Sequence, residues 1–311
     1  MSRDRTPRNL ALIVAAILIA GPFAPQWTVF LLTVALAKGL VVLGLMILLR
    51  CGLVSFGQAL YYCIGAYAAG LLGLRYDVSG VFTLMLAGML ASGVTGFVLG
   101  YLLARYRSIF FGLLSLAISM ILYGLLVKTE ALGSSDGFNL LPSTLAGFRP
   151  ADAWVRYMVL AVAVVVAFVA ALLVNRYLKT PLGRLAPAIK DNEIRVEYMG
   201  ASARHAIHVK YVIAAALAGL GGALAATTVG HIDPEMAYWT TSGEFIFITI
   251  LAGTGSVIAP FLGALIFGII QSVAFDISPN TWQMVLGSSL LVVILFLPNG
   301  LWSIFTRRKA S

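Results

Sequence analysis

Apolar segments long enough to cross a membrane recur along the whole chain. They cover residues 10–25, 28–49, 57–74, 81–104, 109–127, 154–175, 210–229, 244–257, 258–276 and 281–298. A transmembrane helix needs about 20 apolar residues, so the pattern predicts about ten such helices. The segment 244–257 is short and runs into AGTGSVIAP. Because glycine and proline interrupt helices, we expect a broken or half-crossing helix there.

The longest hydrophilic interruption lies between Arg176 and Lys210. Apolar residues recur in it at helical spacing, which predicts an amphipathic helix over 185–199. Its stripe consists of Leu185, Ala188, Ile189, Asn192, Val196 and Met199. Pro181 and Gly183 precede this helix, Pro187 fits a first turn, and Gly200 is placed to end it. Three acidic residues interrupt the basic ones on the polar faces, which favours docking onto a soluble protein over lying on lipid headgroups.

Composition places the chain among membrane proteins. It is 60% hydrophobic and 11% charged, whereas soluble domains carry roughly 25% charged residues. We therefore predict an all-α polytopic integral membrane protein, in which residues 1–311 form a single transmembrane domain with a cytoplasmic loop at about 177–208. The basic head and apolar core at the N-terminus resemble a signal peptide. Because no clear cleavage site follows them, we expect a retained anchor.

The distribution of charge predicts the orientation. With both termini in the cytoplasm and an even number of spans, sixteen of the 21 lysines and arginines fall on the cytoplasmic side, as the positive-inside rule requires. They are Arg3, Arg5, Arg8, Arg50, Arg105, Arg107, Arg176, Lys179, Arg184, Lys190, Arg195, Arg204, Lys210, Arg307, Arg308 and Lys309. The other side receives Arg75, Lys128, Arg149 and Arg156, together with most acidic residues, among them Glu244. The net charge of +9 is thus a topology signal and argues against nucleic-acid binding.

The sequence carries no catalytic or metal-binding motif. Cys51 and Cys63 show no metal-ligand spacing, and the His205–His208 pair lacks a further ligand nearby. We therefore expect a protein that is not an enzyme and holds neither a metal nor another cofactor.

Two glycine-rich segments and one lysine are candidates for a translocation pathway. In residues 48–70, Ser55 and Gln58 lie near membrane depth, so this segment should face the bundle interior. Gly65 and Gly70 are expected to let helices approach closely. Whether Ser55 and Gln58 line a pathway or form structural hydrogen bonds stays open.

Residues 250–268 repeat this pattern of a polar glycine turn followed by a small-residue helix, which is a weak signal of inverted repeats. Lys38 lies about ten residues into the second span, where a lysine costs about 2.5–3.5 kcal/mol. It should face a polar interior, pair with a carboxylate or reach an interface, although no acidic residue is at an evident matching depth. The pathway candidates are Lys38, Ser55, Phe56, Gly57, Gln58, Gly253, Gly255 and Ser256.

Several motifs resemble the permease family of branched-chain amino acid ABC transporters, of the LivM type. The hydrophilic loop resembles the family pattern P-x-G-R-A-x-x-A-I-R-D-N-E in reading PLGRLAPAIKDNE, and Gly200 and the segment AGLGGAL follow in order. GLVSFGQALYYCIGAY, SSDGF and the closing LFLPNGL also match in order, so the resemblance covers nearly the whole chain. Departures include Lys190 for an arginine, Pro187, Arg195 and Val196 in the loop, and Ala252 and Ala259 for glycines.

The resemblance implies a permease subunit of a bacterial inner-membrane importer for branched-chain amino acids. It also implies a second permease, related or identical, two cytoplasmic ATP-binding subunits that bind ATP and Mg, and an external solute-binding protein. The loop helix would contact the ATPases, with candidates Gly183, Arg184, Ala188, Ile189, Lys190, Asp191, Asn192, Glu193 and Gly200. Permeases for urea or short-chain amides resemble the same family. A secondary transporter is the alternative from another class, and it would need ionisable residues at mid-membrane.

Overall fold

A computed structural model describes residues 6–140, 144, 152–277, 281–296 and 300–303, and these are almost entirely α-helical. The helices are α1 (Thr6–Ala20), α2 (Gln26–Leu49), α3 (Gln58–Tyr76), α4 (Val81–Leu103), α5 (Ser108–Lys128), α6 (Asp152–Lys179), α7 (Pro181–Asp191), α8 (Glu193–Tyr198), α9 (Ala203–Val229), α10 (Trp239–Ala252), α11 (Ala259–Ile277) and α12 (Trp282–Phe296). Among the described residues, seven helical spans are long and apolar enough to cross a membrane. The predicted class, an all-α polytopic membrane protein, is confirmed. The number of crossings and the side of each terminus stay predictions.

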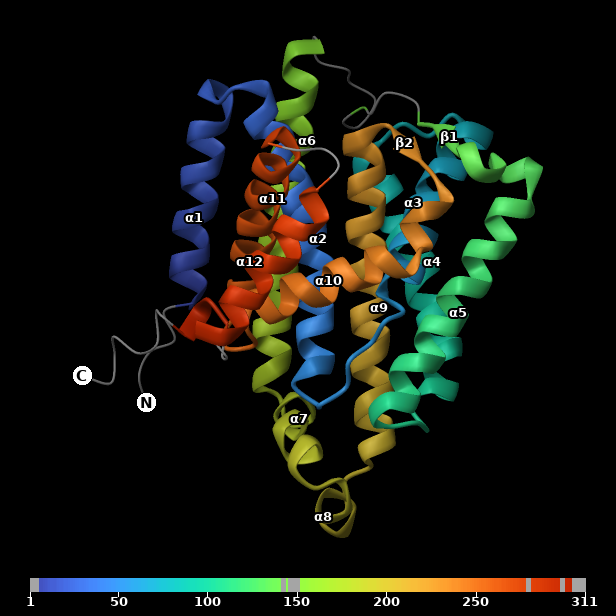
Figure 1. Ribbon diagram of the computed structural model, residues 1–311, viewed down its shortest axis with the longest axis vertical. Helices are drawn as coiled ribbons and strands as arrows, with labels where there is room; N and C mark the ends of the chain where they lie inside the picture. Colours follow the sequence, from blue (N-terminus) through green and yellow to red (C-terminus); the bar gives the residue numbers. More distant parts are fainter. Residues whose placement is uncertain (1–5, 141–143, 145–151, 278–280, 297–299, 304–311) are drawn as a thin grey trace.

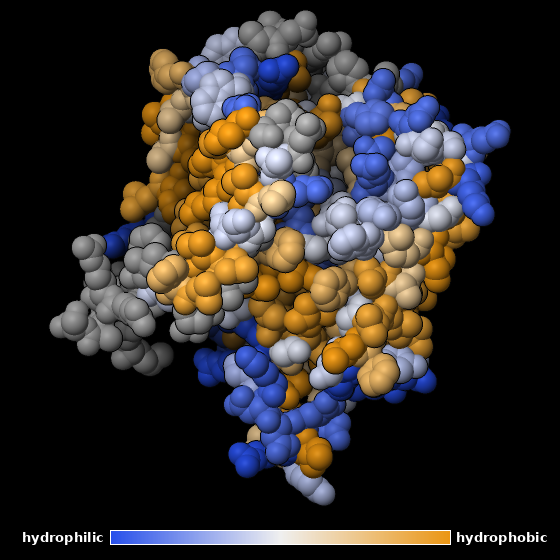
Figure 2. Space-filling view, viewed as in Figure 1, coloured by the Kyte–Doolittle hydropathy of each residue, from blue (hydrophilic) through white to orange (hydrophobic). Residues whose placement is uncertain are grey.

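The bundle has two distinct ends (Figure 1). One carries α7 and α8 and is called the α8 end. The other, called the β end, carries β1 (Phe138–Asn139), which pairs antiparallel with β2 (His231–Ile232). On the face shown in Figure 2, hydrophobic residues form a broad band between the two ends, and hydrophilic residues gather over α7 and α8. A band of this kind is what contact with lipid tails requires, because every exposed group there must be apolar.

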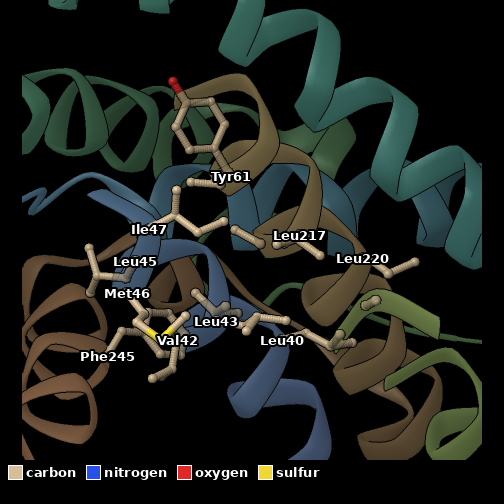
Figure 3. Close-up of a cluster of buried hydrophobic side chains, with 14 of the residues drawn as sticks. Leu40, Val42, Leu43, Leu45, Met46, Ile47, Tyr61, Leu217, Leu220 and Phe245 are labelled. Atoms are coloured by element: carbon tan, nitrogen blue, oxygen red, sulfur yellow. The ribbon is translucent and has the colours of Figure 1, made fainter. Parts of the chain in front are cut away.

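The helix α2 forms the centre of the bundle. Every residue from Gly39 to Leu48 is buried, and α2 packs against α6, α9, α10 and α11. In Figure 3, side chains of α2 from Leu40 to Ile47 meet Leu217 and Leu220 of α9 and Phe245 of α10. A helix that is apolar on all sides is expected to be enclosed by other helices, as α2 is.

Small residues bring the backbones of α3, α4 and α9 together. A Cβ added at Gly65 would collide with the backbone of Gly219, and one added at Gly219 would collide with the Gly88 carbonyl and Ser92. At Gly70 a Cβ would meet the side chains of Ile232 and Phe138. The expectation that Gly65 and Gly70 permit close approach is therefore confirmed, in the way known for small residues at membrane helix interfaces.

The second glycine-rich segment interrupts the helices as predicted. The helix α10 has 14 residues and runs across the bundle rather than along it (Figure 1). Gly253, with φ of 81°, follows its end, and α11 begins at Ala259. The helix starts five residues before the predicted segment, because Tyr238 is extended and lets α10 begin at Trp239.

The weak signal of inverted repeats stays a prediction. The structure adds a direct contact between the two glycine-rich segments, because the Arg50 side chain donates to the Thr254 carbonyl at 2.5 Å and 3.0 Å. Each segment also contains a glycine with positive φ, Gly52 in the first and Gly253 in the second.

Part of the charge pattern falls on residues that the structure does not describe. Arg3, Arg5, Arg149, Arg307, Arg308 and Lys309 lie outside the described residues. So do residues 297–299 of the closing motif.

Candidate functional site: a helix pair at one end and an ion pair in the bundle

The hydrophilic loop folds as α7 and α8, and α7 begins earlier than predicted. Thr180 caps it, since its Oγ1 accepts a hydrogen bond from the Gly183 amide at 3.2 Å, and Pro181 occupies the first turn. Threonine and proline are favourable at these positions. Gly183 lies against the backbone of Tyr177 and Leu178, where no Cβ fits. Pro181 and Gly183 therefore belong to the helix instead of preceding it.

The predicted single helix over 185–199 is wrong, because the helix is interrupted at Asn192. Asn192 is extended, with φ of −160° and ψ of 101°. Its Oδ1 accepts from the Arg195 amide at 3.0 Å and so caps α8. Asparagine side chains favour such caps over helix interiors. Gly200 has φ of 81°, and the Gly200 and Ala201 amides bond back to Glu197 and Val196. This Schellman motif confirms the predicted end.

The helix pair is fixed to the bundle through α9. Ala186, Ile189 and Val196 are buried, whereas Leu185 and Ala188 are half-buried. Lys210 of α9 is itself fully buried, and its ammonium donates to the Leu182 carbonyl at 2.8 Å. The inner face of α7 is therefore part of the hydrophobic core.

A second attachment joins α8 to the turn between α4 and α5. Arg107 donates to both carboxylate oxygens of Glu193, at 2.6 Å and 2.5 Å. Its Nη1 also donates to the Ala104 and Tyr106 carbonyls. Bidentate arginine–carboxylate pairs are strong and geometrically specific. From the charge pattern, Arg107 was predicted to matter for topology alone, and no local pattern could relate two residues that lie 86 positions apart.

Three apolar residues of the loop point away from the bundle. Ile194 is 65%, Tyr198 88% and Met199 70% exposed. We call these three residues the apolar tip. The coupling candidates Arg184, Lys190, Asp191, Asn192 and Gly200 are exposed as well. Contiguous exposed apolar residues often mark a surface that binds a partner. One buried and one half-buried attachment hold this surface on the bundle.

Lys38 forms an ion pair in the middle of the bundle. It is twelve residues from the start of α2, about 18 Å along the helix axis. Its ammonium lies 2.5 Å from Glu244 Oε1 on α10 and 3.4 Å from Gln271 Oε1 on α11. The expectation that no carboxylate matches its depth is therefore wrong. Glu244 was counted on the outer face, at the start of the predicted segment 244–257, but it lies inside α10 beside Lys38. The error arose because α10 begins at Trp239, which brings Glu244 into a helix.

The ion pair borders a cavity of about 730 Å³ that reaches toward the β end. Lys38 and Gln271 lie on its wall among Trp27, Phe30 and Phe275. On the face shown in Figure 2, the surface is hollowed between α11 and α9, and hydrophilic atoms lie in the hollow. A small molecule in the cavity can reach Lys38, whose side chain is 16% exposed, and the neighbouring Glu244 side chain is 21% exposed although it does not line the cavity.

A second cavity, of about 1000 Å³, lies at the α8 end. It joins two groups of predicted residues, since Lys190 and Asp191 of α7 line it together with Gly253 and Gly255. Gly52 also lines it, and a Cβ there would lie 3.1 Å from the Lys190 side chain. The helix α7 thus lies against the turn that follows α2 and faces the turn that follows α10 across this cavity.

The other pathway candidates lie elsewhere. Ser55 and Gln58 are fully buried, which confirms that their segment faces the interior. Ser55 Oγ accepts from the Gly57 amide at 3.3 Å, and Phe56 lines a separate cavity of about 390 Å³. Neither side-chain amide atom of Gln58 has a partner among the described residues. Ser256 Oγ accepts from the Ile258 amide at 3.3 Å, a local turn contact.

Comparison with known proteins identifies relatives along most of the chain. Residues 27–295 match the family described as "Branched-chain amino acid transport system / permease component". The high-affinity branched-chain amino acid transport system permease protein LivM of Escherichia coli (strain K12) is 29% identical, over 94% of this chain and 73% of LivM. The permease protein BraD of Pseudomonas aeruginosa is 27% identical, over 80% of this chain and 86% of BraD. LivH of Escherichia coli (strain K12) is 26% identical, over 80% of this chain and 85% of LivH. No solved structure matched the chain.

Proposed function

We propose, from the premise that this chain belongs to the branched-chain amino acid transport permease family, that it carries these amino acids across a bacterial inner membrane by alternating access. The chain is a multi-pass membrane permease, and its family works in ABC transporter complexes with other subunits. The observation that carries the proposal is the helix pair α7–α8, which has an exposed apolar tip, a buried attachment at Lys210 and a half-buried one at Arg107.

The complex that we propose contains this chain, a second permease, two cytoplasmic ATPases and an external binding protein. ATP and Mg would bind to the ATPases. The α8 end would face the cytoplasm, because the loop there, between Arg176 and Lys210, carries seven of the 21 lysines and arginines. The ATPases would then bind the apolar tip of α8 and the exposed side of α7.

The attachments of the helix pair suggest how movement reaches the pathway. ATP-driven closure of the ATPases would displace α8, and Arg107 would pass that displacement to the turn before α5. Lys190 and Asp191 would pass it to the turns at Gly52 and Gly253, around the cavity at the α8 end. A displaced element changes transport when it favours one pathway state over the other.

The substrate follows from the relatives. The three relatives named above are described as branched-chain amino acid permeases, and none of their names mentions urea or amides. A secondary transporter is less favoured, because such a transporter would belong to a different family from the one that matches this chain.

Replacement of the apolar tip tests the docking surface. We expect the triple variant Ile194→Ser, Tyr198→Ser, Met199→Ser to lose ATPase subunits during affinity purification of the assembled complex, because it removes the apolar area that a partner would bury. Uptake of radiolabelled leucine into proteoliposomes should fall in parallel.

Tyr76→Ser provides the matched control, because Tyr76 is 73% exposed and lies at the end of α3, near the β end. It should retain the ATPases. If the triple variant also retains them and transports leucine normally, the tip is not the docking surface.

A further inference from the structure

The ion pair between Lys38 and Glu244 suggests what the permease recognises. Lys38 on α2 and Glu244 on α10 lie within 2.5 Å of each other, and Gln271 on α11 completes the cluster. Three helices therefore converge on two opposite charges at mid-membrane depth. Charged residues in such a position are usually functional, because their burial is costly.

The charges are accessible as well as paired. A cavity of about 730 Å³ reaches Lys38 from the β end, and this volume lies within the usual range for small-molecule sites. Glu244 lies beside Lys38 and its side chain is 21% exposed. Its wall is mostly apolar and includes Trp27, Phe30 and Phe275, and the charged residues on it are Lys38, Arg156 and Asp276. The cavity therefore combines a few charges with an apolar surface.

The pair also has capacity for further hydrogen bonds. The Lys38 ammonium has three donors, and its contact with Gln271 is long, at 3.4 Å. Among the residues that the structure describes, Glu244 has no hydrogen-bond partner besides Lys38. A molecule that supplies one carboxylate and one ammonium can therefore replace each ion's partner.

We propose that Lys38 and Glu244 form a binding site for the charged main chain of an α-amino acid. The substrate carboxylate binds the Lys38 ammonium, the substrate ammonium binds the Glu244 carboxylate, and the apolar side chain packs against the cavity wall. The inference rests on the proposed transport function. It narrows the substrate class to zwitterions, because urea and amides carry no formal charges with which to replace both ions.

Charge balance explains how such a site persists in a membrane. Without substrate, Lys38 and Glu244 neutralise each other across α2 and α10. With a zwitterion bound, each ion has a new partner of opposite charge, so the site stays neutral in both states. Opening the pair also removes one link between α10 and α2, which connects substrate binding to the position of the short helix.

Direct binding measurements test the proposal. The assembled complex in nanodiscs, without the external binding protein, would be examined by equilibrium dialysis with radiolabelled L-leucine. The competitors are 3-methylbutylamine, which carries only the cation, and 4-methylpentanoate, which carries only the anion. We expect leucine to bind and each competitor to bind at least about tenfold more weakly.

The double variant Lys38→Met, Glu244→Gln removes both charges without leaving an unpaired ion. We expect it to lose leucine binding by at least about tenfold and to lose uptake, while its ATPases still co-purify. The matched control Thr95→Val removes a hydroxyl that donates to the Ala91 carbonyl of its own helix, and it should bind leucine as the wild type does.

The outcomes separate this inference from the proposed function. Wild-type leucine binding in the double variant, or equal competition by the singly charged analogues, would show that the pair is a structural link and would overturn the proposal. Failure of the wild-type complex to bind leucine would also overturn it, even if uptake with the binding protein proceeds. Absence of leucine uptake by the complete wild-type system would instead contradict the proposed function.

Discussion

Single glycines decide how closely the central helices approach. The backbones of α3 and α9 touch at Gly65 and Gly219, and Gly88 of α4 lies at the same point. In a bilayer, association of helices depends on such packing, because burial of apolar surface from lipid provides little driving force. The segment at 48–70 was predicted to face the interior from its composition. Which glycine touches which helix depends on the tertiary arrangement. No local sequence pattern indicates these contacts.

Gly65→Ala should destabilise the protein, because its methyl group would collide with the Gly219 backbone. Overpacking of this kind costs about 1–3 kcal/mol. We expect the apparent Tm of the detergent-purified complex to fall by several degrees. Gly124→Ala is the control, since no atom lies within 4 Å of the added Cβ. Equal Tm values for the two variants would show that helices α3 and α9 do not touch there.

At the scale of elements, the hydrophilic loop was located correctly but its internal structure was not. Helical spacing identified an amphipathic stripe, yet that spacing continues unchanged through Asn192, where the backbone is extended. An asparagine within such a stripe can occupy either a helix interior or an N-cap position. Asn192 occupies the N-cap of α8. The start of α7 at Pro181 was missed for a related reason. Pro181 and Gly183 were placed before the helix, although proline is favourable in a first turn.

Reversal of the Arg107–Glu193 pair tests whether α8 acts through the α4–α5 turn. Glu193→Arg places two cations together, so we expect leucine uptake to fall several-fold. The reciprocal variant Arg107→Glu, Glu193→Arg restores the attraction and should recover most of the uptake. If Glu193 instead contacts the ATPase directly, the second substitution will not rescue the first. Counting ATPase subunits in each purified complex separates loss of docking from loss of coupling.

At the scale of the whole molecule, contacts between distant residues could not be predicted. Lys38 and Glu244 are 206 residues apart, and hydropathy placed Lys38 inside one predicted span and Glu244 only at the start of another. The general architecture could be predicted from the sequence, because the length and hydropathy of each apolar segment are local properties. The interior arrangement could not be predicted, because α10 crosses the bundle and brings the Glu244 carboxylate to α2. Net charge by loop gave an orientation that the described fold accommodates, with α7 and α8 at one end and the β1–β2 pair at the other (Figure 1).

Orientation in the membrane is the last prediction, and labelling of single cysteines tests it. Both native cysteines are buried, and burial raises the pKa of the Cys51 thiol although Lys210 and Arg107 lower it. A buried protonated thiol reacts slowly, so the unaltered protein serves as the control. Ser135→Cys is exposed near the β end, and His205→Cys is exposed at the start of α9. In intact spheroplasts, a membrane-impermeant maleimide should label Ser135→Cys alone, and lysis should make His205→Cys reactive. Labelling of both before lysis would place the two ends on one side. Labelling of His205→Cys alone would reverse the orientation and put α8 beyond the reach of cytoplasmic ATPases.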